Sequence, residues 1–548
     1  MVMFKNETLL GRIFLILIPL ITLAVSPYKS YDPINVPKFS LLVVGSTVLG
    51  FLLLANKFSN SFKLPRILAI LLILFVLQLF IVLLTSKAPI NQQIFGTFGR
   101  NTGLITYLSF VVVLIAAFNV SNPSFALTIT YSISITSMLF AGYCTLQTFN
   151  LDPISWVNPY NPITGSLGNP NFASSFLAMS SCALLVLGIK HIKKIKIFFP
   201  IIVVIIIYLF LIYRSESIQG FLVFAIGSMA ICTIYIYHSG ALRKFLLPTL
   251  VLEVISSLVI IMGILNKGPF SFLYKESIRQ RGYYWDSAVE MMKLRPLSGV
   301  GLDSFGDWYY QVRSVDSAIQ SPLITSSAAH NVFLDMGSNG GFPLFMIYIS
   351  LMIFTLISGI RYLKKSDNFD YGFTSIFAIW ICYQAQSLIS INQIGVAIWG
   401  WGLTGLVIGY LKSNEKQKNG PNKSKNKNLK METFLAFCGF ILGLAIGLPP
   451  LLTDANFRSA YVGQSAEKLI SASLKYPQDT TRILTTAEAL AKSNLMEQSD
   501  SLITNILEVN PRLYGAWQLR YQISQPDSNG QKYSKKMLNE LNPQVKIK

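Results

Sequence analysis

The chain has 548 residues, of which 52% are hydrophobic and only 13% charged, and its mean hydropathy is +0.50. These values exclude an ordinary soluble globular protein and predict a polytopic membrane protein. Lysine and arginine outnumber the acidic residues by 45 to 25, for a net charge of +20. Most of these basic residues lie in short loops between apolar segments, so membrane orientation explains the excess better than a nucleic-acid partner does.

Apolar segments dominate the chain from its beginning, and a span of the hydrocarbon core needs about 20 largely apolar residues. In the first segment, Lys5 and Arg12 accompany an apolar run that ends in small residues, so a signal peptide is the alternative to a membrane span. The sequence predicts an all-α membrane protein of about 12–13 transmembrane helices. The thirteen expected spans are 10–26, 39–55, 67–86, 103–120, 124–146, 171–189, 195–213, 216–237, 245–265, 341–361, 371–390, 394–411 and 433–452.

Basic residues are concentrated in the N-terminal segment and in alternate loops, which the positive-inside rule places in the cytoplasm. The long loop 266–340 and the region 453–548 then face the extracytoplasmic side. The lysine-rich stretch 413–431 is predicted to be a disordered cytoplasmic linker, with lipid binding as the alternative role. The expected units are therefore 1–265 with nine spans, 266–340, 341–412 with three spans, 413–431, 432–452 with the last span, and 453–548.

The C-terminal region has the composition of a soluble helical domain. Pro477 and Pro511 are 34 residues apart, and Pro543 follows after another 32. Apolar residues recur at helical spacing between these prolines, which is typical of tetratricopeptide-like helix pairs. About two such repeats fit, so we expect a small helical domain that offers a surface to a protein partner.

Three short outward loops carry polar groups at the margins of spans. Loop 87–102 contains Arg100, and loop 147–170 contains Asn169 within a Gly-Asn-Pro-Asn sequence. In the third, Arg214 and Glu216 form a charged pair at the end of a span, which is costly unless it is solvated or used. Either the pair reaches the interface without further function, or Arg214 points into an outward cavity and binds an anionic ligand.

The long loop contains an amphipathic helix, predicted over 281–293, which places Trp285 on its apolar face. Arg279 and Arg281 lie at the start of this helix, where the helix dipole favours anions rather than cations. An anionic ligand explains these two arginines better than helix stability does. A glycine turn at 299–301 follows and leads to Asp303.

His330, followed by Asn331, precedes the next span. A lone loop histidine is commonly structural, but an imidazole opposite several arginines can act as a general base. Guanidinium groups hold pyrophosphate through bidentate bonds, so the combination indicates transfer chemistry on a phosphate-linked substrate. This scheme requires neither a metal nor a cofactor, and the five cysteines show no metal-ligand spacing.

In these residues the chain resembles the O-antigen ligase and O-antigen polymerase superfamily. The resemblance covers about residues 30–412 and depends on an ordered set of short motifs. These are Gly99-Arg100-Asn101-Thr102-Gly103, Gly168-Asn169-Pro170-Asn171, Arg281 with Trp285 four residues on, Arg295-Pro296 with Gly299 and Gly301, Phe305, His330-Asn331, and Gly340-Gly341.

The resemblance implies a GT-C-like, inverting, metal-independent glycosyltransferase of the bacterial inner membrane. It would move a glycan from an undecaprenyl-pyrophosphate carrier to a lipid, protein or glycan acceptor. His330 would be the base and Arg281 a pyrophosphate ligand. Arg214 would be the second catalytic arginine, although it precedes Ser215 here rather than following a serine. The residues expected to bind substrate are Arg279, Arg100, Asn169, Trp285, Asn331 and Asp303.

Three alternatives remain open at this level. A polymerase that extends the glycan on its carrier would use the same site. A transporter of polysaccharide or lipid carrier would also have twelve or more spans, but Glu253 is the main charge within them and no half-to-half symmetry is evident. A membrane-anchored interaction protein would use the C-terminal repeats and leave the long loop unexplained.

Overall fold

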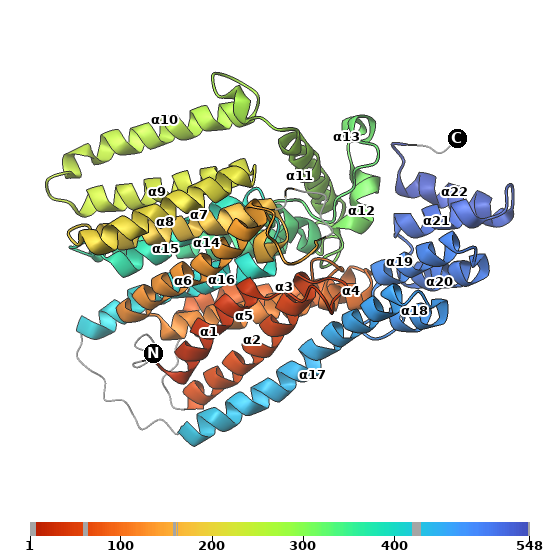
Figure 1. Cartoon of the computed structure of the whole chain (residues 1–548), viewed down its shortest axis with the longest axis horizontal. Coiled ribbons are helices and arrows are strands. Elements are labelled where there is room, and N and C mark those ends of the chain that lie inside the picture. Colours follow the sequence, from red (N-terminus) through yellow and green to blue (C-terminus); the bar gives the residue numbers. More distant parts are fainter. Residues whose placement is uncertain (1–6, 59–63, 157–160, 162, 419–428, 546–548) are drawn as a thin grey trace.

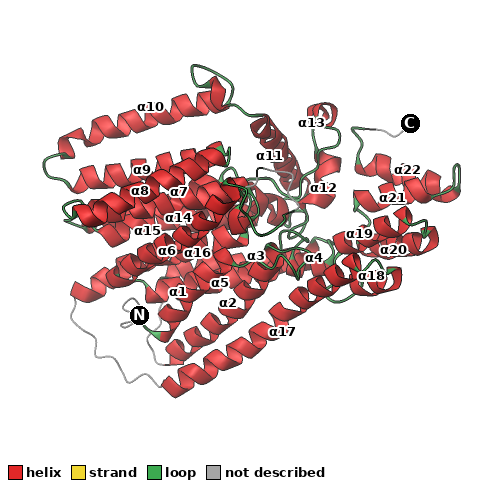
Figure 2. Cartoon of the chain, viewed as in Figure 1, coloured by secondary structure: helices red, strands yellow, loops and turns green. Residues whose placement is uncertain are grey.

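A computed structural model of the chain describes residues 7–58, 64–156, 161, 163–418 and 429–545. Over these residues every regular element is a helix and no strand occurs (Figure 2). Ten of the described helices are long and apolar enough to cross a membrane, which confirms the predicted all-helical, polytopic fold.

Each of the thirteen predicted spans coincides with one helix. Ten of them are the long apolar helices, α1 and α5 are shorter apolar helices, and α15, with 17 residues, belongs to neither group. The helices are α1 (Leu9–Leu23), α2 (Asn35–Phe58), α3 (Arg66–Thr85), α5 (Leu104–Val120), α6 (Pro123–Thr148), α7 (Pro170–Lys190), α8 (Ile195–Arg214), α9 (Ile218–His238), α10 (Leu246–Ile264), α14 (Val332–Lys365), α15 (Tyr371–Ser387), α16 (Ile394–Lys418) and α17 (Leu429–Val462).

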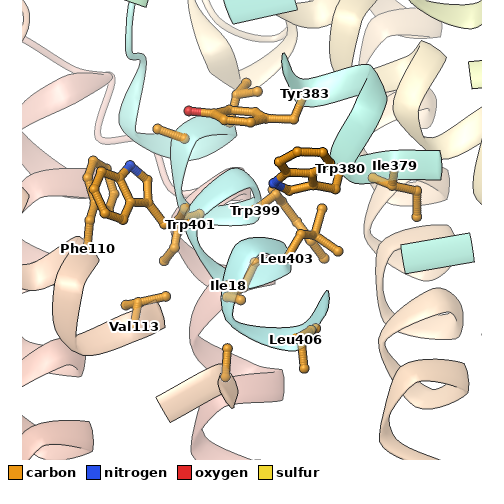
Figure 3. Close-up of a cluster of buried hydrophobic side chains, with 14 of the residues drawn as sticks. Ile18, Phe110, Val113, Ile379, Trp380, Tyr383, Trp399, Trp401, Leu403 and Leu406 are labelled. Carbon is orange, nitrogen blue, oxygen red and sulfur yellow. The ribbon is translucent and has the colours of Figure 1, made fainter. Parts of the chain in front are cut away.

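Aromatic side chains fill the centre of the bundle around α16 (Figure 3). Trp401 stacks on Phe110 of α5, with 5.6 Å between ring centroids. The indole of Trp399 donates a hydrogen bond to the hydroxyl of Thr22, 2.9 Å away. Large rings bury much apolar area, and a satisfied indole N–H avoids the cost of an unpaired polar group. The core is therefore rigid at the helices that carry the loops.

Helix α17 packs along α2 through glycines spaced four residues apart. Gly439, Gly443 and Gly447 face the backbone of α2, and a Cβ at Gly443 would lie 2.6 Å from Cα of Val44. Small residues at this spacing allow close helix packing within a membrane. The helix is longer than its predicted span at both ends, since it runs from Leu429 to Val462, and its early start together with the extension of α16 to Lys418 shortens the predicted linker. Residues 419–428 of that linker lie outside the described residues.

Helix α10 differs from the other spans in packing. Figure 1 shows it at the edge of the bundle, beyond α9. In the most apolar 18-residue stretch of this helix, no residue is buried within the chain. The carboxylate of Glu253, in the middle of this helix, accepts a 2.7 Å hydrogen bond from Thr233 of α9.

The four loops predicted to face outward meet at one end of the bundle, which we call the loop end (Figure 1). Gln92 donates to the carbonyl of Asp303, and Lys275 donates to the carbonyl of Glu216. The elements at this end are α4 (Ile90–Phe95), η2 (Gly165–Leu167), η4 (Ser271–Leu273), α11 (Glu276–Leu294), α12 (Phe305–Val312) and α13 (Val315–Gln320). The predicted amphipathic helix is α11, which begins five residues earlier than expected.

A small hydrophobic cluster of its own holds the loop end together. It contains Tyr284, Ala288 and Met291 of α11, Phe305, Trp308 and Tyr309 of α12, and Val300 and Ala329. Because Ala329 is part of this cluster, the residue that follows it, His330, is held against α11.

The C-terminal region forms five helices that pack one on the next, with an apolar core of their own. This domain lies beside the loop end, next to α12 and α4 (Figure 1). Its assignment to tetratricopeptide-like repeats stays a prediction. The helices are α18 (Ala466–Ser473), α19 (Thr480–Lys492), α20 (Met496–Val509), α21 (Tyr514–Ile523) and α22 (Asn529–Leu541).

Candidate active site

His330 lies in a turn that its neighbours fix on both sides. The carboxylate of Asp335 accepts a 2.7 Å bond from the backbone N–H of Ala329. On the other side Asn331 caps α14, its side-chain oxygen accepting from the N–H groups of Phe333 and Leu334. His330 itself has a φ of 51°, in the left-handed region that non-glycine residues rarely adopt. Such strain is typical of functional positions, where the surroundings hold the residue in place.

The imidazole of His330 faces α11. The centroid of its ring lies 5.3 Å from that of Tyr284. The positive charge of Arg281 is close enough to disfavour protonation of the imidazole. Burial, together with the positive charges of Arg281 and Arg100, lowers the pKa of His330 to about 3. In the described part of the chain the ring has no hydrogen-bond partner. His330 is therefore neutral at physiological pH and able to accept a proton.

Arg100 forms the centre of a buried charge network behind this turn. Its guanidinium lies 3.4 Å from the carboxylate of Asp303 and 3.4 Å from that of Asp335. It also donates to the carbonyl of Ser327. Asp303 in turn accepts from the backbone N–H of Thr97 at 2.8 Å. The predicted substrate ligands Arg100 and Asp303 thus bind each other and support the His330 turn.

Two adjoining cavities open at the loop end between α8, α9 and α11. Cavity A has a volume of about 590 Å³ and cavity B about 290 Å³. Both are lined by Asn161, Glu216, Ser217, Ile218 and Lys275, so these residues mark the junction between the two.

The cavities carry more positive than negative charge. Arg214 lines cavity A and Arg281 lines cavity B, whereas Lys275 and Glu216 line both. Burial lowers the pKa of Arg281, which means that its charged form is poorly solvated. Within the described residues its guanidinium has neither an ion pair nor a hydrogen bond. Arg281 is half-buried, and a partly desolvated cation without a partner is costly, so an anionic ligand in cavity B would reduce that cost.

Cavity B also contains polar atoms without partners. The indole N–H of Trp285 and the side-chain oxygen of Gln219 are both buried and unbonded, and both residues line this cavity. The other end of the Gln219 amide donates to Ser175 at 2.9 Å. Orphan donors and acceptors beside an unpaired guanidinium are typical of a site built for a polar ligand.

Three predicted site residues lie in other structural roles. Arg279 is exposed and pairs with Glu276, 2.6 Å away, rather than lining either cavity. Asn169 caps α7 through a 2.8 Å bond from the N–H of Asn171, and Asn171 is the one that lines cavity B. Asn331 caps α14, as described above. Arg281 and Trp285 therefore share cavity B, and Arg281 is near His330, which lines neither cavity, whereas Arg214 lines cavity A.

Sequence reasoning missed several residues of this region. Asp335 accepts a hydrogen bond from the turn that carries His330, and the ring of Tyr284 contacts the imidazole. Gln219 lines cavity B. Asp335 follows Asn331 by four residues, so it lies one helical turn into the capped helix and can reach back to the turn. Tyr284 follows Arg281 by three residues, which places both on one face of α11. For Gln219 the sequence offers no signal, because its role depends on the packing of α9 against α7.

For metal binding, no group of three or more His, Cys, Asp or Glu side chains converges anywhere in the described ranges. The cavities instead offer guanidinium, ammonium, amide and indole donors, which suit anions and hydroxyl groups.

Fold and site together define a polytopic, all-helical membrane protein with a cationic cavity beside a neutral histidine. Residues 173–349 match the family model described as O-antigen ligase. The matched segment contains Arg214, Arg281 and His330 and supports the resemblance to the O-antigen ligase superfamily. A comparison with curated proteins found no match.

Proposed function

We propose that the chain is a glycosyltransferase that moves a glycan from undecaprenyl pyrophosphate to an acceptor hydroxyl. The observation that carries this function is the unpaired, half-buried Arg281, which lines cavity B and whose charge acts on the neutral His330. Both residues lie in the segment that matches the O-antigen ligase family.

The reaction needs a stabilised leaving group and a base. Arg281 and Arg214 would bind the pyrophosphate oxygens and neutralise the charge that develops as the bond between the sugar and the phosphate oxygen breaks. The acceptor oxygen attacks the anomeric carbon from the opposite face, which inverts its configuration. His330 takes the acceptor's proton, and undecaprenyl pyrophosphate leaves with the bonding electron pair.

Binding of the donor would change the pKa of His330. The charges of Arg281 and Arg100 contribute to the low pKa of His330, after burial. A bound pyrophosphate brings negative charge to Arg281 and offsets its effect on the imidazole. We therefore expect the pKa of His330 to rise when the donor is bound, which makes it a stronger base only in the loaded site.

The acceptor defines the variant of this function. A lipid or protein acceptor makes the chain a ligase, and a growing glycan makes it a polymerase with the same bond-forming step. By the positive-inside rule the cavities would lie on the extracytoplasmic side, and the resemblance implies the bacterial inner membrane, where lipid-linked glycans are used. The chemistry needs no cofactor or metal ion.

Two substitutions test this function in the full-length protein in lipid nanodiscs. His330→Ala should lower glycan transfer at least about 100-fold, as removal of a general base does, while leaving donor binding intact. Arg281→Ala should reduce both donor binding and transfer. The donor is a purified undecaprenyl-pyrophosphate-linked glycan, and the product's acceptor is identified by mass.

Lys293→Ala is the matched control, because Lys293 lies on the same helix but is exposed and pairs with Glu290. This variant should transfer at the rate of the unmodified protein. Near-normal transfer by both the His330 and Arg281 variants would contradict the proposed mechanism.

A further inference from the structure

A third cavity lies in the C-terminal domain, between α20, α21 and α22. We call it cavity C, and its volume is about 840 Å³. It lies outside residues 173–349, which match the O-antigen ligase family model, and the transfer step proposed above does not use it. Nine of its twelve lining residues have polar side chains. Such a lining favours a ligand rich in hydroxyl groups over an apolar one.

Tyr533 of α22 gives cavity C an aromatic ring in a fixed orientation. This ring packs at 70° against the indole of Trp517, with 5.6 Å between the centroids. The indole is itself held, because its N–H donates a 2.8 Å hydrogen bond to the carbonyl of Pro511. Tyr533 nevertheless stays 55% exposed, so part of its side chain is open to a ligand. A rigid, exposed ring of this kind provides an apolar surface on which the C–H face of a sugar can stack.

Three polar side chains of cavity C are available to a ligand. Glu497, Ser501 and Gln525 line the cavity, and within the described residues their side chains form no hydrogen bond or ion pair. Asp500 and Arg520 also line it but bind each other, 3.0 Å apart. A carboxylate, a hydroxyl and an amide together can accept from and donate to neighbouring sugar hydroxyls. Glu497 gives the lining one net negative charge, so cavity C favours a neutral glycan over an acidic one.

Docking of the C-terminal domain sets the position of cavity C relative to the His330 turn. Met496, the first residue of α20, lines the cavity, whereas Asn510, just after the end of α20, donates to Asp307 of α12. Helix α20 has 14 residues and is therefore about 21 Å long. Figure 1 accordingly shows the turn between α21 and α22 at the far side of the domain from α12. A chain of several sugars can extend over such a distance, whereas a single sugar cannot.

We propose that cavity C binds a neutral glycan, namely the sugars of the donor that lie far from its pyrophosphate. The inference deepens the proposed function and rests on it for the source of this glycan. The pyrophosphate end would occupy the transfer site, while the outer sugars lie along the C-terminal domain and reach cavity C. Cavity C would thereby favour donors with long chains over donors with a single sugar.

The other occupant to consider is the protein partner that the sequence pattern predicts for this domain. A protein segment docks mainly through apolar side chains at the centre of an interface. Met496 and Ile523 are the only aliphatic side chains among the described residues that line cavity C. The lining therefore fits sugar hydroxyls better than a protein segment, and the glycan should bind in the absence of any other protein.

The first test measures binding of free glycan to the full-length protein in lipid nanodiscs. The probe is the glycan released by mild acid from the undecaprenyl-pyrophosphate lipids of the cells that contain the protein, separated into single repeating units and longer chains. Tyr533→Ala should weaken binding of the longer chains about tenfold, and Glu497→Gln about fivefold. Tyr533→Phe should keep most of the affinity, because it keeps the ring. Glu508→Gln is the matched control and should change nothing, since Glu508 is exposed on the same helix as Glu497 but does not line cavity C.

The second test separates a binding role from damage to the domain. With a donor that carries a longer chain, Tyr533→Ala should raise KM for transfer about tenfold and leave kcat unchanged. With undecaprenyl pyrophosphate that carries only the first sugar of the same glycan, both constants should equal those of the unmodified protein. Damage to the docking of the domain on α12 would instead change transfer from both donors.

The outcomes distinguish failure of this inference from failure of the proposed function. If the unmodified protein transfers glycan but binds no free longer chains, cavity C is not a glycan site and the function stands. The same conclusion follows if Tyr533→Ala stays folded by thermal unfolding and binds these chains with unchanged affinity, or if it changes transfer equally for both donors. If no glycan is transferred from undecaprenyl pyrophosphate, although the free chains bind in a manner that depends on Tyr533, the proposed function fails and cavity C remains a glycan site.

Discussion

Charged residues at the loop end divide into two groups with opposite roles. Arg100, Asp303 and Asp335 are all buried and form two ion pairs around Arg100, and Asp335 accepts a hydrogen bond from the turn that carries His330. Arg281 is half-buried, and no described residue forms an ion pair or hydrogen bond with its guanidinium. Charges that stabilise the structure are paired, and the charge available to a ligand is the unpaired one.

The buried network of Arg100, Asp303 and Asp335 should contribute to the stability of the protein. Arg100→Met would leave two buried carboxylates facing each other, and removing one partner of a buried pair typically costs about 3–5 kcal/mol. The free energy of unfolding should fall by about that amount, as measured by denaturant titration in detergent micelles. Transfer should fall as well, because Asp335 then loses the partner that orients it under the His330 turn.

An exposed pair provides the control for that measurement. Glu290→Gln breaks the ion pair between Glu290 and Lys293, whose side chains are 48% and 62% exposed, respectively. Exposed ion pairs contribute about 0–1 kcal/mol to stability. If Arg100→Met destabilises the protein no more than Glu290→Gln does, the network does not support the turn.

The roles predicted for the site residues stay predictions, but the structure shows which of their positions and partners the sequence could indicate. Arg281 and Trp285 both line cavity B because they are four residues apart on one helix, and the charge of Arg281 acts on His330. Arg100 and Asp335 are 235 residues apart, and no local pattern predicts such a contact. The pairing of Arg279 with Glu276 was readable, since residues three apart are neighbours on a helix.

At the scale of elements, α14 consists of two helices that meet at Gly341. This residue has φ 74° and ψ −178°, a conformation essentially restricted to glycine. The turn after α11 fits into the break, where the N–H of Val300 donates to the carbonyl of Ser338 at 2.8 Å and that of Phe342 to Pro296 at 2.8 Å. The break thus joins the His330 half of α14 to the end of α11, which carries Arg281.

Gly341→Ala should disrupt this junction. A Cβ there would lie 2.6 Å from the carbonyl oxygen of Pro296, and the backbone conformation would be strained in any case. We expect a loss of about 1–3 kcal/mol in the free energy of unfolding, with reduced transfer. Gly142→Ala is the control, because nothing lies within 4 Å of a Cβ at that position. Equal stability of the two variants would contradict the role assigned to the break.

Hydropathy predicted a helix at each of the thirteen expected spans, but only ten of the described helices are long and apolar enough to cross a membrane, and several predicted ends are wrong. The expected span 341–361 is only the second half of α14, because the first half, from Val332, is too polar to register. Helix α16 extends to Lys418 and α17 begins at Leu429, within the lysine-rich stretch expected to be linker. A helix continues wherever its backbone bonds are satisfied, whereas hydropathy detects only the part that suits lipid.

At the scale of the whole molecule, the C-terminal domain contacts the loop end of its own chain. The guanidinium of Arg512 lies 3.3 Å from the ring centroid of Trp308 in α12, and burial lowers the pKa of Arg512 to about 10. Asn510 donates to Asp307 at 3.1 Å. The sequence predicted this domain and a protein-docking role for it, but not that part of its surface packs on α12.

The contact between the C-terminal domain and Trp308 should support the His330 turn. Trp308 belongs to the same hydrophobic cluster as Tyr284 and Ala329, which flank His330. Arg512→Ala removes a partly desolvated cation–π contact worth about 2 kcal/mol. We expect faster amide hydrogen exchange in α12 and in the turn 326–331, together with slower transfer. Arg520→Ala is the matched control, because Arg520 pairs with Asp500 inside the C-terminal domain. That variant should leave exchange in α12 unchanged. If Arg512→Ala alters exchange only within the C-terminal helices, the domain is docked without supporting the catalytic turn.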